Sequence, residues 1–389
     1  MPKLAQLDHC TGCTACASVC PKGVIAMAAD ADGFLGPVID AGRCVECGLC
    51  EKVCPVVSPV AAPQRQPQAY AAYSGDEAMR MASSSGGVFT ELARQILGQG
   101  GAVYGAAYDA QFAVRHICAQ TEADLAKLRG AKYAQSDLRG IFPEVKARLK
   151  NGQPVLFSGT PCQVAGLKAC LRKNYANLVT VDFVCHSVPS PMAWQEYVKL
   201  RARQDNGGQL PSTVNLRDKA TGWSRYGYSN RFTYADGRTH SAGSGESLYM
   251  KLFGGGYISR NACENCRFKG YSRVSDVTVG DFWGIWDIAP EMDDNKGTSV
   301  VLVQSEKGAA LLEAIRERLV LKEVSLEDAS AQNPAMIRTT PVSPRRAEAL
   351  QQIREGQIEA CGAWFVPPKR SFSKRLRLLA GRVVRKIMK

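Results

Sequence analysis

The cysteines of the first sixty residues constrain this chain most, because their spacing occurs twice. The spacing C-x2-C-x2-C-x3-C-P is first spelled by Cys10, Cys13, Cys16, Cys20 and Pro21, and then by Cys44, Cys47, Cys50, Cys54 and Pro55. Thiolates at this spacing hold two 4Fe–4S clusters, and the fourth cysteine of each run binds the other cluster. The sequence therefore predicts one cluster on Cys10, Cys13, Cys16 and Cys54, and a second on Cys20, Cys44, Cys47 and Cys50.

A pair of zinc knuckles is the alternative for this block. Zinc sites usually use two separated C-x2-4-C pairs rather than a run of four cysteines with a trailing proline, so the cluster interpretation is favoured. Residues 1–60 resemble a bacterial-type two-cluster ferredoxin. Such a domain is an entry or exit port for electrons, and it predicts an electron donor or acceptor protein, such as a ferredoxin, as partner.

The compartment decides how the 15 cysteines are interpreted. The first residues lack the apolar segment of a signal peptide, and no run of about 18 apolar residues follows. We therefore expect a cytoplasmic protein, in which dense cysteine indicates metal or redox chemistry rather than disulfides.

Beyond a Pro- and Gln-rich linker at residues 61–68, the pattern becomes alternating α/β. We expect a pair of strands within 101–120, a strand, turn and helix in 154–171, and a buried strand in 177–185. Near-alternating polarity in 221–240 predicts an antiparallel hairpin that turns at Asp236-Gly237. Residues 299–319 add a further strand and helix.

Seven cysteines lie outside the first block, and four of them suggest a third site. Cys162 follows a predicted strand where the chain turns into a helix, and Cys185 ends the next predicted strand. If those strands are parallel, their carboxyl ends are neighbours. Cys263 and Cys266 form a C-x-x-C that needs two more ligands. We predict a third iron–sulfur cluster on these four cysteines, with a zinc clip as the alternative.

A flavin would link one-electron clusters to a two-electron organic substrate. No G-x-G-x-x-G follows a strand, so a Rossmann site is not supported. The Ser83–Gly87 turn directly before a helix suits a pyrophosphate, although a simple helix cap is an equal alternative. The segment GAKYAQS at 130–136 adds a lysine, a tyrosine and a serine.

Five separated motifs carry a family resemblance: SSSGGVFTELARQIL, GAKYAQS, FSGTPCQVAGL, VDFVCHSVPSP and CENCRFKGYSRVSDVTVGDFWG. Over about residues 69–330 the chain resembles the coenzyme F-420 hydrogenase/dehydrogenase beta-subunit family, and most of all its bacterial members associated with surface-polysaccharide gene clusters. The resemblance implies an FAD and a 4Fe–4S cluster, with the ferredoxin block as a common fusion. One departure is Ser187, where glycine is expected, which puts the local turn in doubt.

The resemblance also implies the site residues and the domain organisation. The FAD-contacting candidates within the motifs are Ser84, Ser85, Gly86, Gly87, Lys132, Tyr133, Ser136, Gly159 and Thr160. We expect a small bacterial-type ferredoxin domain, of α+β class, fused to an α/β flavoprotein domain with a mixed sheet. The flavin-binding region spans 69–150, the region with the third iron–sulfur site spans 151–345, and a basic amphipathic tail spans 346–389.

Other polar residues have two interpretations each. His186 could shuttle protons or cap a turn, and Asp281 and Trp283 could line a flavin cavity or belong to the core. Three cations could meet an anionic ligand or form a solvated face: Arg217, Lys219 and Arg225.

The C-terminal tail carries much of the net charge of +13. Nine Lys and Arg and no acid lie in residues 369–389, which leaves about +4 for the rest and argues against nucleic-acid binding by the body. Apolar residues recur there at steps of three or four. The pattern predicts a basic amphipathic helix suited to peripheral attachment at the anionic inner face of the membrane, or to docking on protein.

The sequence thus predicts an iron–sulfur flavoprotein oxidoreductase that passes electrons between ferredoxin-type clusters and FAD. It would reduce or oxidise an unidentified organic substrate or a deazaflavin coenzyme. The alternative is an electron-transfer subunit with no substrate of its own.

Overall fold

The computed structural model describes residues 2–4, 8–62 and 65–365. The strands are β1 (Ile25–Ala29), β2 (Leu35–Ile39), β3 (Gln68–Ser74), β4 (Ala102–Tyr108), β5 (Val114–Ala119), β6 (Val155–Ser158), β7 (Leu178–Phe183), β8 (Thr213–Asp218), β9 (Ser229–Thr233), β10 (Thr239–Gly243), β11 (Val277–Asp281), β12 (Ser299–Val303) and β13 (Leu319–Val324). The helices are α1 (Ala15–Val19), α2 (Leu49–Lys52), α3 (Glu77–Met81), α4 (Val88–Gly98), α5 (Glu122–Leu128), α6 (Ile141–Lys150), α7 (Pro161–Leu171), α8 (Pro191–Asn206), α9 (Leu248–Gly254), α10 (Ile285–Ile288), α11 (Glu306–Glu313), α12 (Leu326–Ser330) and α13 (Arg346–Arg354).

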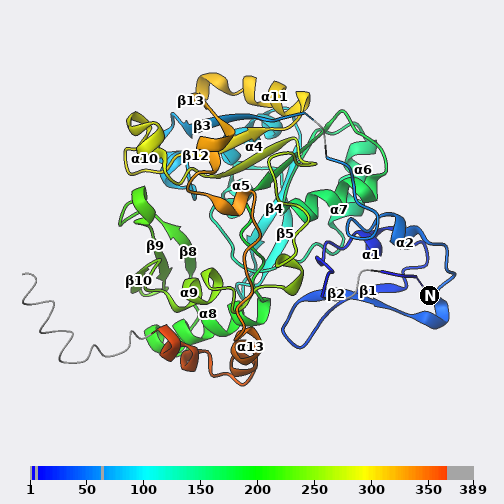
Figure 1. The fold of residues 1–389 in the computed structure, drawn as a ribbon, viewed down its shortest axis with the longest axis horizontal. Coiled ribbons are helices and arrows are strands. Elements are labelled where there is room, and N and C mark those ends of the chain that lie inside the picture. The colour runs from blue at the N-terminus through cyan, green and yellow to red at the C-terminus, as the bar shows by residue number, and fades with distance from the viewer. Residues whose placement is uncertain (1, 5–7, 63–64, 366–389) are drawn as a thin grey trace, which may run out of the picture.

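One eight-stranded sheet forms the centre of the molecule (Figure 1). Its strand order is β13-β3-β12-β11-β7-β6-β4-β5. The four inner strands β11, β7, β6 and β4 are mutually parallel, and the flanking strands are antiparallel to their neighbours. The predicted mixed sheet is therefore confirmed. Regions 69–150 and 151–345 both contribute strands to it.

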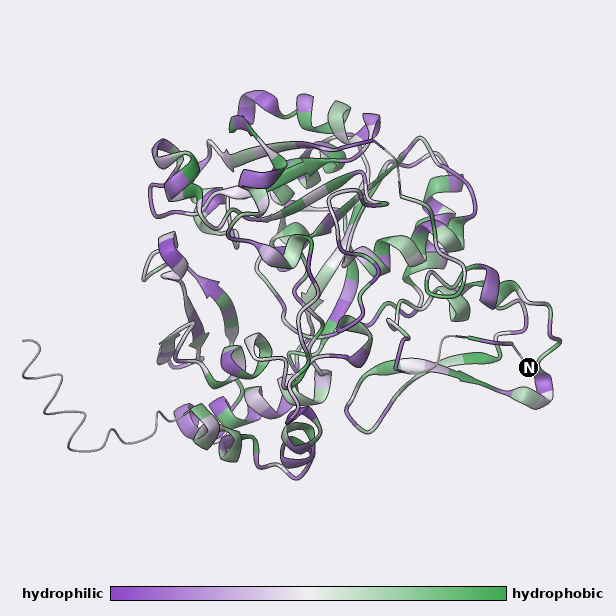
Figure 2. Ribbon diagram, in the orientation of Figure 1, coloured by the Kyte–Doolittle hydropathy of each residue, from purple (hydrophilic) through white to green (hydrophobic). Residues whose placement is uncertain are grey.

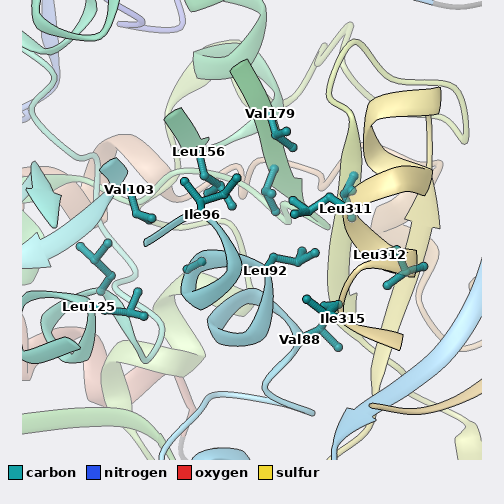
Figure 3. Close-up of a cluster of buried hydrophobic side chains, with 14 of the residues drawn as sticks. Val88, Leu92, Ile96, Val103, Leu125, Leu156, Val179, Leu311, Leu312 and Ile315 are labelled. Atoms are coloured by element: carbon teal, nitrogen blue, oxygen red, sulfur yellow. The ribbon is translucent and has the colours of Figure 1, made fainter. Parts of the chain in front are cut away.

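Helices cover both faces of this sheet. Helix α4 presents Val88, Leu92 and Ile96, four residues apart, to one face, where they pack with residues of α5 and α11 (Figure 3). Leu156 of β6 belongs to that cluster, whereas its neighbours in the strand pack with α6 and α7. Because successive strand residues point to opposite faces, α6 and α7 cover the other face. Because both faces are covered, the central strands consist mostly of hydrophobic residues (Figure 2).

The ferredoxin block lies beside α6 and α7 (blue in Figure 1). Its hairpin β1–β2 is antiparallel, and its own core is small. Cys13, Ala15 and Val53 of this block are buried together with Phe142 of α6 and Leu167 of α7. The block therefore completes its hydrophobic packing against the rest of the chain.

A second, three-stranded sheet has the order β10-β9-β8, and α8, α9 and α13 pack beside it. Its hairpin turns at Gly237, with φ of +85°, as predicted. Helix α13 and the 3-10 helix Ile358–Phe365 bury Leu350, Ile353 and Cys361 in this second core. Residues 346–365 of the predicted tail therefore belong to the folded body, and 366–389 lie outside the described residues. No helix in the described ranges is long and apolar enough to span a membrane.

Candidate functional site

The eight cysteines of the N-terminal block line two small cavities, four to each. One cavity is lined by Cys10, Cys13, Cys16 and Cys54. The other is lined by Cys20, Cys44, Cys47 and Cys50. The structure thus groups them in the crossed manner that the spacing predicts. We call the first group the inner site and the second the outer site, since Cys13 is buried and Cys47 is exposed.

The inner site lies directly against helix α7. A Cβ added to Gly166 of this helix would lie 2.8 Å from Cys13 Sγ, so only glycine permits the close approach. The same helix carries Cys162 in its first turn, four residues earlier. Burial raises the pKa of Cys13, and the neighbouring Cys162 thiolate raises it further. The inner site and Cys162 are therefore electrostatic neighbours.

Cys162 and Cys185 follow neighbouring parallel strands. Strands β6 and β7 pair in parallel from Val155 to Ser158, which confirms the expected arrangement of their ends. Thr160 and Gln163 form a capping box at the start of α7, and this fixes the turn that presents Cys162.

Backbone pairing holds the C-x-x-C segment beside Cys185. The Arg260 N–H donates to Val188 O over 2.9 Å, and Ser190 N–H donates to Ile258 O over 2.8 Å. The Val188 N–H also points to Cys263 Sγ at 3.4 Å. These bonds bring residues 258–266 next to residues 185–190, far away in sequence.

Ser187 occupies this turn without strain. Its φ is not in the left-handed region, so the turn does not require glycine. The Ser187 hydroxyl instead pairs with the Ser259 hydroxyl, with 2.7 Å between the oxygens. This departure from the expected glycine therefore adds a contact between the two cysteine-bearing segments.

Cys162, Cys185, Cys263 and Cys266 interact with one another electrostatically, and we call them the third site. Burial raises the pKa of Cys162 to about 12, and burial with neighbouring thiolates raises the pKa values of Cys185 and Cys263. Among the described residues, no group of three or more His, Cys, Asp or Glu converges to hold a single metal ion, and this applies equally to the inner and outer sites. A 4Fe–4S cluster is larger than one ion and is held by thiolates that lie farther apart.

A cavity of about 680 Å³ adjoins the third site. Cys185 and His186 form part of its wall. Eight of the nine predicted FAD-contacting residues line it: Ser84, Ser85, Gly87, Lys132, Tyr133, Ser136, Gly159 and Thr160. Three segments that are far apart in the sequence thus meet in one hollow of ligand-binding size.

Gly86 is the exception, and its contact with FAD stays a prediction. It does not line the cavity, because it packs against strand β3: an added Cβ would lie 2.4 Å from Ala72 O. Its N–H donates to Ser299 Oγ over 2.9 Å. The glycine is required by this close packing.

Family models match three parts of the chain. The 4Fe-4S dicluster domain matches residues 9–57. The N-terminal and C-terminal models of the coenzyme F420 hydrogenase/dehydrogenase beta subunit match residues 69–142 and 152–329. The chain belongs to the coenzyme F420 hydrogenase/dehydrogenase beta-subunit family. It is therefore an iron–sulfur protein of an oxidoreductase family.

Among solved structures, the chain is similar to a subunit in the F420-reducing NiFe hydrogenase complex from Methanosarcina barkeri. The identity is 16% and the TM-score 0.47, over 78% of this chain and 94% of that one. A comparison of the chain with curated proteins found no match.

His116 also lines the cavity, and the sequence analysis did not identify it. Its ring lies on β5, with Nδ1 2.7 Å from Ser136 Oγ and Nε2 2.9 Å from Ser158 O. Burial lowers the pKa of His116 to about 4, and burial likewise lowers that of His186 to about 4. Both imidazoles are therefore neutral near pH 7, with one donor and one acceptor nitrogen each. In His116 both are engaged, because Nε2–H donates to Ser158 O and Nδ1 accepts from the Ser136 hydroxyl.

The lining of the cavity also includes an ion pair that lies among aromatic rings. Arg217 contacts Asp281, and its guanidinium lies 3.9 Å from the centre of the Tyr228 ring and 5.2 Å from that of Trp283. Arg217 and Asp281 both line the cavity. A solvated face is therefore excluded for Arg217.

The two other predicted cations of this region differ from Arg217. Lys219 is buried and donates to the carbonyls of Arg80 and Ser85, at 2.5 and 2.6 Å, and it does not line the cavity. Arg225 is exposed.

Proposed function

We propose that this beta-subunit family member is an FAD-dependent iron–sulfur oxidoreductase. It would pass electrons between three 4Fe–4S clusters and FAD, and exchange two electrons with an organic substrate or a deazaflavin coenzyme. One observation carries the proposal: Cys185 belongs to the third site and also lines the cavity. A metal site and an organic cofactor would share this wall.

The cavity fits a flavin dinucleotide in size and in chemistry. Its volume is within the range of small-molecule and cofactor sites. Helix α4 begins at Val88 beside the cavity after Gly87, which adopts a left-handed conformation. N–H groups and the positive end of this eleven-residue helix would favour a pyrophosphate there, together with the Lys132 ammonium.

The remaining cavity residues would orient the cofactor and exclude water. A flavin bound there exchanges electrons one at a time with clusters and in pairs with organic substrates. Ser136, held by its hydrogen bond to His116 Nδ1, could offer its hydroxyl oxygen to it. The Arg217–Asp281 pair would add charged groups to the cavity wall.

The positions of the cysteine sites support an order of electron transfer. The outer site includes the exposed Cys47, which suits contact with a redox partner protein such as a ferredoxin. The inner site lies against α7, and α7 leads to Cys162 of the third site. Electrons would pass between the outer, inner and third sites in that order, in either direction.

The competing function is an electron-transfer subunit without a substrate. A relay needs only a contact surface over its last cofactor, whereas an enzyme needs a hollow that admits a small molecule. The 680 Å³ cavity would hold the flavin under either function, so reoxidation of the bound flavin by a small-molecule acceptor distinguishes the two.

The test is anaerobic reconstitution with iron, sulfide and FAD. We expect about one FAD per chain. After reduction of the protein, this FAD should be reoxidised by one acceptor from a panel of deazaflavins, nicotinamides, quinones and nucleotide sugars. Ser84→Trp should fill the cavity and abolish FAD binding while iron content is kept. Ser241→Trp, at an exposed position of β10, should bind FAD normally. Absence of FAD from the unaltered protein would refute the enzyme proposal.

A further inference from the structure

Four arginines of the described chain are more than nine-tenths buried: Arg80, Arg217, Arg260 and Arg273. Three of them contact a carboxylate, in the pairs Arg80–Asp294, Arg217–Asp281 and Arg273–Asp182. Within the described ranges Arg260 contacts none. A buried cation without an anion is costly, so the counter-charge of Arg260 requires an explanation.

Within the described residues, each hydrogen bond of the Arg260 guanidinium ends on a neutral oxygen. Nε donates to Cys10 O over 2.5 Å, Nη1 to Gln135 Oε1 over 3.2 Å, and Nη2 to Leu35 O over 3.1 Å. These acceptors engage three of the five N–H groups and leave the positive charge uncompensated.

Arg260 links the inner site and the third site through its side chain and its backbone. On one side it holds the backbone of Cys10, the first cysteine of the inner site. On the other side, the carbonyl of Arg260 accepts the Cys263 N–H over 3.0 Å, and its charge acts on the thiols of Cys162 and Cys263. Arg260 therefore adjoins ligands of both sites.

We propose that Arg260 is the shared counter-ion of the inner and third clusters and sets their reduction potentials together. This inference rests on the proposed function, since it requires a cluster at the third site. A 4Fe–4S cluster with four thiolates is a net anion, and its potential responds to net charge and to nearby hydrogen bonds. Each cluster gains one negative charge on reduction, so a fixed cation beside both clusters favours both reduced forms.

The shared position matters for the step between the two clusters. In that step one electron leaves one cluster and enters the other, and no bond is made or broken. Because Arg260 adjoins ligands of both sites, the attraction of its charge for the electron is present before and after the transfer. Arg260 is thus a positioning residue that shifts the two potentials in the same direction.

Lys269 provides a one-sided comparison. Its Nζ donates to the Cys185 carbonyl and, over 2.8 Å, to Ala335 O, and it contacts no carboxylate in the described part of the chain. Its charge acts on thiols of the third site, and in the described part of the chain its ammonium makes no hydrogen bond to a residue of the inner site. Loss of Lys269 should therefore affect the third cluster alone.

The experiment is a redox titration of the full reconstituted chain, monitored by electron paramagnetic resonance. For Arg260→Met we expect the reduced-to-oxidised ratio of both the inner and the third cluster to fall about tenfold at fixed potential, or about 59 mV for a one-electron couple. Arg260→Lys, which keeps the charge and loses the three-way hydrogen bonding, should restore most of both potentials. Lys269→Met should shift only the third cluster.

Arg346→Met is the matched control. Arg346 also joins the ferredoxin block to the body, but its charge already faces Asp32 at 3.6 Å, so its loss should leave both potentials unchanged. If Arg260→Met loses a cluster, Arg260→Gln, which also removes the charge, is titrated instead.

Three results would overturn the inference: unchanged potentials in the uncharged variant, a shift confined to one cluster, or an equal shift in Arg260→Lys. A protein with only two clusters would refute the third site of the proposed function as well, whereas three clusters with unmoved potentials would refute only the role of Arg260.

Discussion

Cys13 of the ferredoxin block lies directly against Gly166 of helix α7, since a Cβ added to Gly166 would lie 2.8 Å from Cys13 Sγ. The inner site can sit on α7 only because residue 166 has no side chain. Cys162 of the third site lies one helical turn away on the same helix. This packing brings two predicted clusters together.

Replacement of Gly166 should separate the inner and third sites. In Gly166→Ala the methyl group would meet Cys13 Sγ and Cβ, at 2.8 and 2.9 Å, and such overpacking costs about 1–3 kcal/mol. We expect a lower thermal midpoint and weaker magnetic coupling between the two reduced clusters. In Gly98→Ala, where a Cβ on helix α4 would meet nothing within 4 Å, both should stay unchanged. Unaltered coupling in Gly166→Ala would place the contact between the sites elsewhere.

Flavin affinity should fall as pH rises through neutrality. Burial lowers the pKa of Lys132 to about 7, so in the flavin-free protein its ammonium loses its proton above that pH. A bound phosphate favours the charged form, and binding above pH 7 must therefore take up a proton. Between pH 6 and 8 the affinity for FAD, measured by fluorescence quenching, should fall about tenfold, as expected for one proton.

Two variants assign this pH dependence to Lys132. Lys132→Met should bind FAD more weakly at pH 6 and show little change up to pH 8. Burial also lowers the pKa of Lys219 to about 7, but Lys219 does not line the cavity, so Lys219→Met should keep the full pH dependence. The imidazoles of His116 and His186, with pKa values of about 4, stay neutral over this range. A pH dependence that survives in Lys132→Met would contradict the assignment.

The basic C-terminal segment should govern membrane attachment. Residues 369–389 carry nine cations and no acid, which favours contact with anionic lipid. Deletion of this segment should abolish sedimentation with vesicles rich in phosphatidylserine and leave iron content unchanged. Binding by the truncated chain would place the contact on the body instead.

The sequence predicted the parts of the site that depend on local patterns. The two cysteine runs, the buried strands before Cys162 and Cys185, and the Ser/Gly turn before α4 are each encoded within about twenty residues. Parallel pairing of β6 with β7 then follows from their continuous apolar runs. Local spacing thus identified the grouping of the cysteines, and the motifs of the family resemblance identified eight of the residues that line the cavity.

Contacts between distant segments could not be predicted in this way. Arg260 lies in none of the five motifs, and Gly166 lies in FSGTPCQVAGL without any local sign of its role, because the role of each depends on the docked ferredoxin block. Helix α13 is a further example: Arg354 Nη2 lies 2.7 Å from Asp32 Oδ1 of the ferredoxin hairpin, 322 residues away. Such pairs are set by tertiary packing and leave no periodic signal.

The most direct test of the account is the iron content of anaerobically prepared protein, compared with that of Cys263→Ser. Three 4Fe–4S clusters give about twelve irons per chain, and loss of the third site leaves about eight with the two ferredoxin-type signals intact. Cys361→Ser, at a buried cysteine that is hydrogen-bonded to Gln352 and belongs to none of the three sites, is the control and should keep about twelve. About eight irons in the unaltered protein, or no loss in Cys263→Ser, would contradict the third site.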